Sequence, residues 1–158
     1  MSTSPNPFMA RAIEISRAAV ASDDAAPFGA VVVKDGIIVG EGVNRVVSTS
    51  DPTSHGEVEA IRDACRKLGT WNLEGCELYT SCEPCELCVA AMYWARIERV
   101  YYAAHLSDAE ALGFDCATLR TLVRADPDDR AVPYVPLMRE EAVAVLDDWA
   151  KDPAASRF

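Results

Sequence analysis

Residues 30–39 read Ala-Val-Val-Val-Lys-Asp-Gly-Ile-Ile-Val, two β-branched runs on either side of an Asp35-Gly36 pair. Val and Ile favour strands, and an Asp-Gly pair between two apolar runs is typical of a two-residue hairpin turn. The stretch therefore predicts two neighbouring antiparallel strands. Strand-like and helix-like segments then alternate along the chain, which favours a three-layer α/β domain whose sheet is mixed rather than purely parallel.

The other elements follow from periodicity and from residues typical of helix ends. Asn6-Pro7 has the form of a helix N-cap followed by proline, and Gly69 is typical of a helix end. Residues 45–54 are expected to form a polar loop. The expected elements are helices at 7–21, 55–68, from Pro84 onward and at 138–149, short helices at 107–112 and 119–124, and strands at 78–80, 100–103 and 134–137. We therefore expect one α/β/α domain over residues 1–158, with a mixed sheet of about five strands.

Composition narrows the functional class. The chain has 158 residues, a formal net charge of -10 and six Cys. A negative surface repels phosphate backbones, so nucleic acid is not the expected partner. The N-terminus shows no secretory signal pattern, and no apolar run has the roughly 20 residues needed to cross a membrane. We therefore expect a cytoplasmic protein, in which clustered Cys indicates metal binding or catalysis rather than disulfides.

Two short motifs carry the chemistry: His55-Gly56-Glu57 and Pro84-Cys85-Glu86-Leu87-Cys88. Each is expected at the start of a helix. Cys85 and Cys88 are three residues apart and so share one face of a helical turn. The positive end of the helix dipole lowers thiol pKa values there, which favours two thiolates.

A zinc ion is the expected cofactor. Cys85, Cys88 and His55 give two thiolates and one imidazole, which leaves the fourth tetrahedral position of zinc open for water. Glu57 is then placed to take a proton from that water and to return it to the substrate ring and the departing amine. A His-x-Glu motif combined with Pro-Cys-x-x-Cys is the signature of zinc deaminases. An alternative is a closed structural zinc site in a binding module, with Cys82 as the fourth ligand.

Several segments resemble one family. Residues 51–62 and 79–88, which hold the two motifs, are similar to bacterial guanine deaminases of the cytidine deaminase-like fold. Further similar segments are Pro27-Phe28-Gly29-Ala30, Tyr93-Trp94-Ala95-Arg96 and Gly113-Phe114-Asp115. The resemblance implies a zinc-dependent aminohydrolase that releases ammonia from a cyclic amidine in a free nucleobase. It also implies a homodimer in which the C-terminal helix and tail, residues 138–158, are exchanged between subunits.

The resemblance assigns further residues to substrate binding. Asn44 is expected to hydrogen-bond the base, Phe28 and Trp94 to line the pocket, and the Gly56 backbone to meet a ring carbonyl. The chain departs from the family where a second acidic residue usually follows Asp115, since Cys116 stands there, and where a terminal tyrosine is replaced by Phe158. It also departs at Gly56, where the family usually has Ala between the His and the Glu.

These departures leave the substrate open. A site without a hydrogen-bonding carboxylate discriminates less strongly between rings. The alternatives to guanine are cytosine, isocytosine, an amino-triazine such as ammeline, and guanosine. Asp115 is a possible replacement for the acid missing at Cys116.

Overall fold

The computed structural model of the protein describes residues 5–22 and 25–156. The predicted hairpin is confirmed: β1 (Ala26–Lys34) and β2 (Ile37–Asn44) are antiparallel neighbours joined at Asp35-Gly36. β1 also pairs antiparallel with β3 (Cys76–Cys82), and β3 pairs parallel with β4 (Arg99–Ala104). The strand order is β2-β1-β3-β4, so the sheet is mixed as predicted.

The sheet has four strands, so the expectation of about five was wrong. Residues 134–137, the predicted extra strand, form neither helix nor strand and pair with no strand in the part of the chain that the structure describes. Pro133 and Pro136 explain the error, because each lacks the backbone N–H that a strand donates to its neighbour. The predicted loop at 45–54 also contains one short helix, α2 (Val46–Thr49).

The main helices begin and end close to where the sequence predicts. Asn6 caps α1 (Pro7–Val20), because its side-chain oxygen accepts hydrogen bonds from the backbone N–H groups of Phe8 and Met9. Gly69 ends α3 (Gly56–Leu68) in the left-handed conformation, at φ +68°. The remaining helices are α4 (Glu86–Ala95), α5 (Leu106–Glu110), α6 (Cys116–Arg124) and α7 (Arg139–Lys151), with a 3₁₀ turn at Pro127–Asp129.

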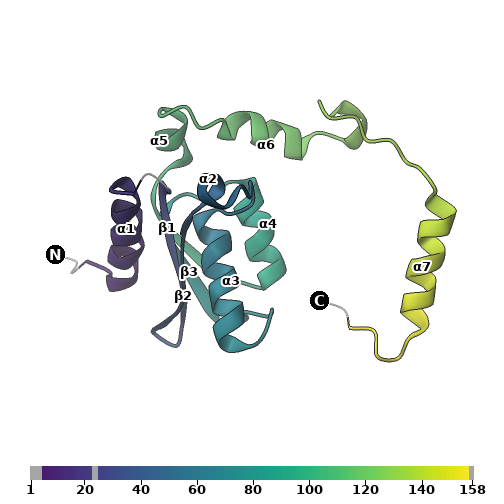
Figure 1. Ribbon diagram of the computed structural model, residues 1–158, viewed down its shortest axis with the longest axis horizontal. Helices are drawn as coiled ribbons and strands as arrows, with labels where there is room; N and C mark the ends of the chain where they lie inside the picture. Colours follow the sequence, from purple (N-terminus) through teal and green to yellow (C-terminus); the bar gives the residue numbers. More distant parts are fainter. Residues whose placement is uncertain (1–4, 23–24, 157–158) are drawn as a thin grey trace. The chain divides into compact units, whose positions relative to one another are not determined.

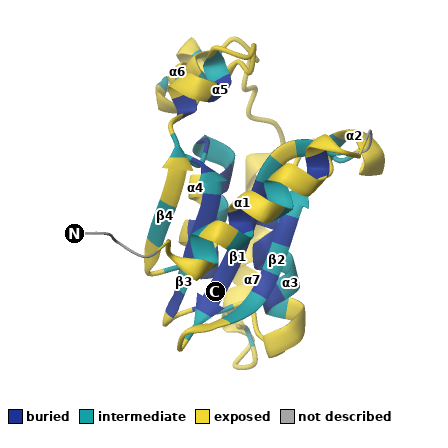
Figure 2. Ribbon diagram, turned by 90° about the vertical axis from the view of Figure 1, so that its left-hand side faces the viewer, coloured by how far each residue is buried: buried dark blue, intermediate teal, exposed yellow. Residues whose placement is uncertain are grey.

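Alternation along β1 builds the two sides of the core. Ala30 and Val32 face the cluster formed with α3 and α4, whereas Val31 and Val33 face the cluster that includes residues of α1. Figure 1 shows α1 on one side of the sheet and α3 and α4 on the other. The two inner strands, β1 and β3, are the most buried part of the sheet (Figure 2). The predicted α/β/α layering is therefore confirmed.

Glycines in β2 allow α3 to lie very close to the sheet. A Cβ atom on Gly42 would be 2.2 Å from the carbonyl oxygen of Gly56 and 2.3 Å from the backbone nitrogen of Ala60. A Cβ atom on Gly40 would be 2.4 Å from the carbonyl oxygen of Ala60. These distances are too short for any side chain. Glycine at both positions therefore allows α3 to pack closely against β2.

The chain divides into two compact units, Met1–Arg120 and Thr121–Phe158. The first unit holds the sheet and the core. In the second unit, α7 has no buried residue. The large exposed apolar side chains of this second unit are Val123, Val132, Tyr134, Val135, Leu137, Met138, Val145, Leu146 and Trp149. No helix in the described residues combines the length and the apolar character that crossing a membrane requires.

We predict that Gly42→Ala destabilises the fold, because the new methyl group must displace the backbone of α3. The expected loss is about 1–3 kcal/mol of unfolding free energy, as for overpacked cores, and urea unfolding measures it. Ile37→Ala on the same strand is the control, since Ile37 is 66% exposed and its loss should cost no more than about 0.5 kcal/mol. A Gly42→Ala protein as stable as the parent would contradict the close packing.

Candidate active site

The starts of two helices bring three metal-binding side chains together. His55 is the N-cap residue of α3, Cys85 is the N-cap residue of α4, and Cys88 lies in the first turn of α4. The Nδ1 atom of His55 is 3.5 Å from the sulfur atoms of both Cys85 and Cys88, and the two sulfur atoms are 3.8 Å apart. The three ligand atoms lie within 4.8 Å of one another, which places them around a single possible ion position.

The site favours negative charge on sulfur. The hydrogen bond between Cys85 and Cys88, helped by His55, lowers the pKa of the Cys85 thiol to about 4 despite its burial. The same hydrogen bond, together with burial, raises the pKa of Cys88. The pKa of His55 is raised, mainly by its hydrogen bond with Cys85.

The donor set fits zinc. Two thiolates and one imidazole are ligands that Zn²⁺ prefers, and three protein ligands are typical of catalytic rather than structural zinc sites. Cys82 is not part of the cluster. It ends β3, is buried, and its thiol donates to the backbone carbonyl of His105 at 3.7 Å. The geometry therefore favours the open three-ligand site over the closed site with Cys82.

Glu57 lies directly beside the cluster and is only 6% exposed. The Thr80 hydroxyl lies 3.4 Å from its Oε1 and 3.1 Å from the carbonyl oxygen of Cys82, and the Cys88 thiol donates to its Oε2 at 3.3 Å. Burial raises the pKa of the Glu57 carboxyl. A carboxyl group with a raised pKa, fixed next to a metal site, has the properties needed to accept and return protons.

A cavity of about 310 Å³ opens onto these residues. Phe28 and Phe114 meet edge to face in its wall, with ring centroids 5.0 Å apart and an interplanar angle of 82°. The side-chain oxygen of Asn44 accepts from the backbone N–H of Val46 at 3.2 Å, which leaves the NH₂ group as the part of Asn44 that can donate to a ligand. The lining residues are Ala26, Phe28, Asn44, Val46, Val47, Pro52, His55, Glu57, Cys82, Glu83, Cys85, Leu106, Phe114 and Cys116.

Most residues proposed from the sequence lie at this cavity. Those in its wall are Phe28, Asn44, His55, Glu57, Cys85 and Cys116. Cys88 and Gly56 do not line it, but both are buried next to residues that do. Sequence reasoning did not select Leu106, Phe114 or Glu83. Phe114 belongs to the Gly113-Phe114-Asp115 segment. An aromatic residue in a polar turn is the sequence feature that indicates a place for Phe114 in the cavity wall.

Two other residues proposed from the sequence, Trp94 and Asp115, do not line this cavity either. Trp94 is 53% exposed on α4. Asp115 is exposed, and its side-chain oxygen accepts from the backbone N–H of Thr118 at 3.2 Å, so it caps the start of α6. Phe158 lies outside the described residues. The side chain of Asp115 therefore contacts the backbone of α6 rather than the cavity.

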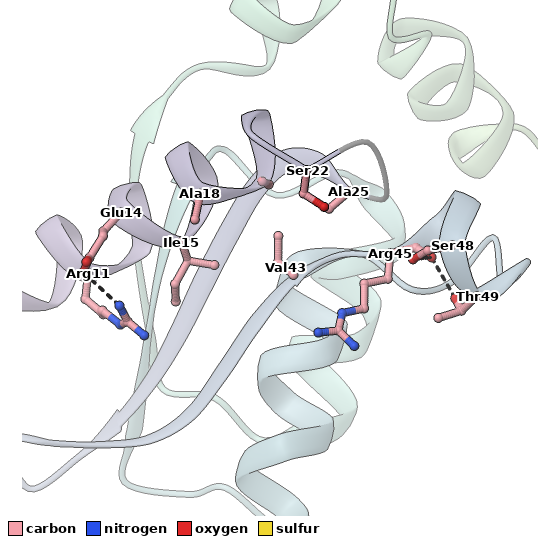
Figure 3. A pocket seen from close by; sticks show the side chains of 11 residues that line it. Arg11, Glu14, Ile15, Ala18, Ser22, Ala25, Val43, Arg45, Ser48 and Thr49 are labelled. Carbon is pink, nitrogen blue, oxygen red and sulfur yellow. Dashed lines mark hydrogen bonds and ion pairs between the residues drawn. The ribbon is translucent and has the colours of Figure 1, made fainter.

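A larger cavity, about 630 Å³, lies between α1, the end of β2 and α2 (Figure 3). Its lining includes Arg11, Glu14 and Arg45 but neither His nor Cys. Arg11 is held by ion pairs with Glu14 at 2.9 Å and with Glu41 at 2.8 Å. Since none of the three clustered metal-binding residues lines this cavity, its greater volume does not make it the reaction site.

Comparisons with known proteins agree with this geometry. The family described as the cytidine and deoxycytidylate deaminase zinc-binding region matches residues 2–104. A guanine deaminase from Bacillus subtilis is 42% identical over 142 residues, which cover 90% of this chain and 91% of that protein. The crystal structure of guanine deaminase from Bacillus subtilis matches with a TM-score of 0.93 at 38% identity, over 99% of both chains. A tRNA-specific adenosine deaminase from Aquifex aeolicus is 49% identical, but over only 49% of this chain and 52% of that protein.

We predict that Cys85→Ser weakens zinc binding by more than the roughly 10–100-fold typical of losing an outer partner of a metal ligand. Cys82→Ser is the matched control and should keep one zinc per chain, because the Cys82 thiol points to a backbone carbonyl. Metal analysis after dialysis against a weak chelator measures both. Loss of zinc from Cys82→Ser would instead support the closed four-ligand site.

Proposed function

We propose that this chain, which belongs to the guanine deaminase branch of the cytidine and deoxycytidylate deaminase family, removes the amino group of guanine as ammonia. The chain is a zinc-dependent hydrolytic deaminase, and its substrate is the part that we propose. The observation that carries the proposal is the three-ligand cluster opening, beside buried Glu57, onto a cavity of about 310 Å³. A cavity of this size suits one free base.

The chain's own residues divide the work of the reaction. His55, Cys85 and Cys88 would hold the zinc ion, which would supply an acidified water molecule as the nucleophile. Glu57 accepts one proton of that water and passes it to a ring nitrogen. It then accepts the second proton, from the hydroxyl group now on the ring carbon, and donates it to the departing amine. The Thr80 hydroxyl lies 3.4 Å from one oxygen of the Glu57 carboxylate. Asn44 donates from its NH₂ group to an acceptor on the ring.

The apolar wall positions the ring and excludes bulk water. Phe28 and Phe114 present aromatic surfaces to a planar base, and rings of this kind pack well against heterocycles. In the dry cavity, the charge that develops on the ring interacts more strongly with nearby dipoles. We place the reaction in the cytoplasm, because the two zinc-binding thiols must stay reduced.

Cys116 favours a second candidate substrate class. It stands in the cavity wall as a thiol where a carboxylate would bind ring N–H groups, and Asp115 is engaged in capping α6. A shift towards cytosine, isocytosine or ammeline is therefore the alternative to guanine. Guanosine deamination needs room for a ribose as well as the base. A tRNA substrate is disfavoured by the net charge of -10, since phosphate binding depends on cationic side chains.

We predict that the zinc-loaded protein releases ammonia from guanine faster than from cytosine, isocytosine, ammeline or guanosine. Glu57→Gln should lower kcat by at least about 100-fold, the lower range for a general acid–base group, while zinc content stays at one per chain. An ammonia assay over this panel measures both effects. Dominant turnover of a pyrimidine or triazine would replace guanine by the alternative class. Ammonia release that survives Glu57→Gln unchanged would reject the role of Glu57.

We further propose that the two units act together as one deaminase domain within a homodimer whose C-terminal segments are exchanged. Two features support this arrangement. The second unit carries exposed apolar side chains, among them Val145 and Leu146 on α7. β4 is an edge strand, with backbone groups that an added strand can pair with. Residues 134–137 of a second copy would pair with that edge, since Pro is tolerated in edge strands. Phe158 would then close the partner's cavity.

We predict a dimer by light scattering, and its dissociation by Val145→Glu, because a charge cannot be buried unpaired in an apolar interface. Val20→Glu is the matched control, since Val20 is 73% exposed on α1 and Val145 is 68% exposed on α7. Val20→Glu should remain a dimer. A parent protein that is monomeric at all concentrations would contradict the exchange.

A further inference from the structure

We propose that Gly56 is a positioning residue for the aromatic wall of the cavity. It allows the backbone of Phe28 to lie against the start of α3, and this contact fixes the Phe28 ring where it meets Phe114. The inference rests on the proposed function, because the wall is assigned to hold the substrate ring. It concerns the fit of the substrate and leaves zinc binding to His55, Cys85 and Cys88.

The first observation is the space at Gly56. This residue begins α3 and is buried. A Cβ atom built on it would lie 2.5 Å from the carbonyl oxygen and 3.1 Å from the carbonyl carbon of Phe28. The obstacle is backbone rather than a flexible side chain, so even a methyl group requires the chain at Phe28 to move.

The second observation is an irregularity in β1 at the same place. Ala26 pairs with Asn44, but the next paired residue is Gly29, which faces Val43. Pro27 and Phe28 are therefore a bulge without partners in β2. Bulges turn a side chain in a new direction and occur often beside active sites. Here the bulge turns the Phe28 carbonyl towards Gly56.

The third observation is that the bulge is held from its other sides. The Ser16 hydroxyl on α1 donates to the Pro27 carbonyl at 2.5 Å. The backbone N–H of Gly29 donates to the Ser81 hydroxyl at 3.0 Å. A Cβ atom on Gly29 would be 2.5 Å from the carbonyl oxygen of Ala12. The bulge is thus confined between α1, β3 and α3, and Phe28 has little freedom to move.

A methyl group at Gly56 is therefore expected to displace the Phe28 ring relative to Phe114, from which its centroid is 5.0 Å away. Outside its two chain neighbours, the next atom that this methyl group meets is the backbone nitrogen of Asn44 at 3.6 Å, an ordinary van der Waals distance. Because the ring contacts the substrate before and during reaction, a displaced ring weakens ground-state and transition-state binding alike. Such a change raises KM and leaves kcat nearly unchanged.

The experiment compares Gly56→Ala with the parent, using the base that the parent turns over fastest. The expected result is a three- to tenfold increase in KM, a kcat within twofold, and one zinc per chain. In a Phe28→Leu background, which lacks the ring, Gly56→Ala should change KM by less than twofold. Gly36→Ala is the control, because Gly36 has φ +75° in the remote hairpin turn. It should lower thermal stability without changing KM.

Ser16→Ala is the second variant and is the milder change, since it removes only the hydroxyl that holds Pro27. It should raise KM in the same direction with zinc retained. An unchanged KM in Ser16→Ala overturns the proposal even if Gly56→Ala does not fold. A full Gly56→Ala effect in the Phe28→Leu background also overturns it. A parent protein that deaminates none of the bases instead refutes the proposed function, so the two failures are distinguishable.

Discussion

The meeting of two helix starts at one point is the constraint on which the rest of this structure depends. His55 comes from the start of α3 and Cys85 and Cys88 from the start of α4, so two positive helix ends face the same small volume. The helix dipoles favour negative charge there, and the hydrogen bond with Cys88 stabilises the Cys85 thiolate. Zinc binding therefore requires that both helices keep their distance and direction relative to the sheet.

The sheet meets this requirement through small residues. Gly40 and Gly42 of β2 let α3 approach the strand more closely than any side chain would allow. Gly56 then brings the start of α3 against the bulge of β1. A continuous line of close backbone contacts thus runs from the edge strand through the metal-binding helix to the aromatic wall. Metal position and substrate position are set by the same packing, although different residues bind each one.

Features encoded in neighbouring residues could be predicted from the sequence. The hairpin at Asp35-Gly36, the caps at Asn6 and Gly69, and the two metal motifs all depend on short-range geometry, and the structure brings the motif residues together as expected. The fifth strand at 134–137 was wrong, because its β-branched and aromatic residues were weighted above Pro133 and Pro136. The short helix α2 was missed because Val46–Thr49 is too short to show periodicity.

The cavity wall could be predicted only in part. Phe114 and Leu106 reach the cavity through the path of the chain after β4, and no local pattern shows where that path leads. The contact of Gly56 with Phe28 was equally hidden, since it joins residues 28 positions apart through space that a side chain would fill.

The register of the hairpin has a consequence for how the site is assembled in time. β1 and β2 are consecutive, and their pairing places Ala26 opposite Asn44, so Phe28 and Asn44 are brought near each other by a local contact. Hairpins of this kind form within roughly 1–10 microseconds. The cluster instead joins His55 to Cys85 across 30 residues, and such long-range closure is slower. The part of the ring-binding wall formed by Phe28 and Asn44 can therefore form before the metal cluster, whereas Phe114 completes that wall only after the chain beyond β4 has folded.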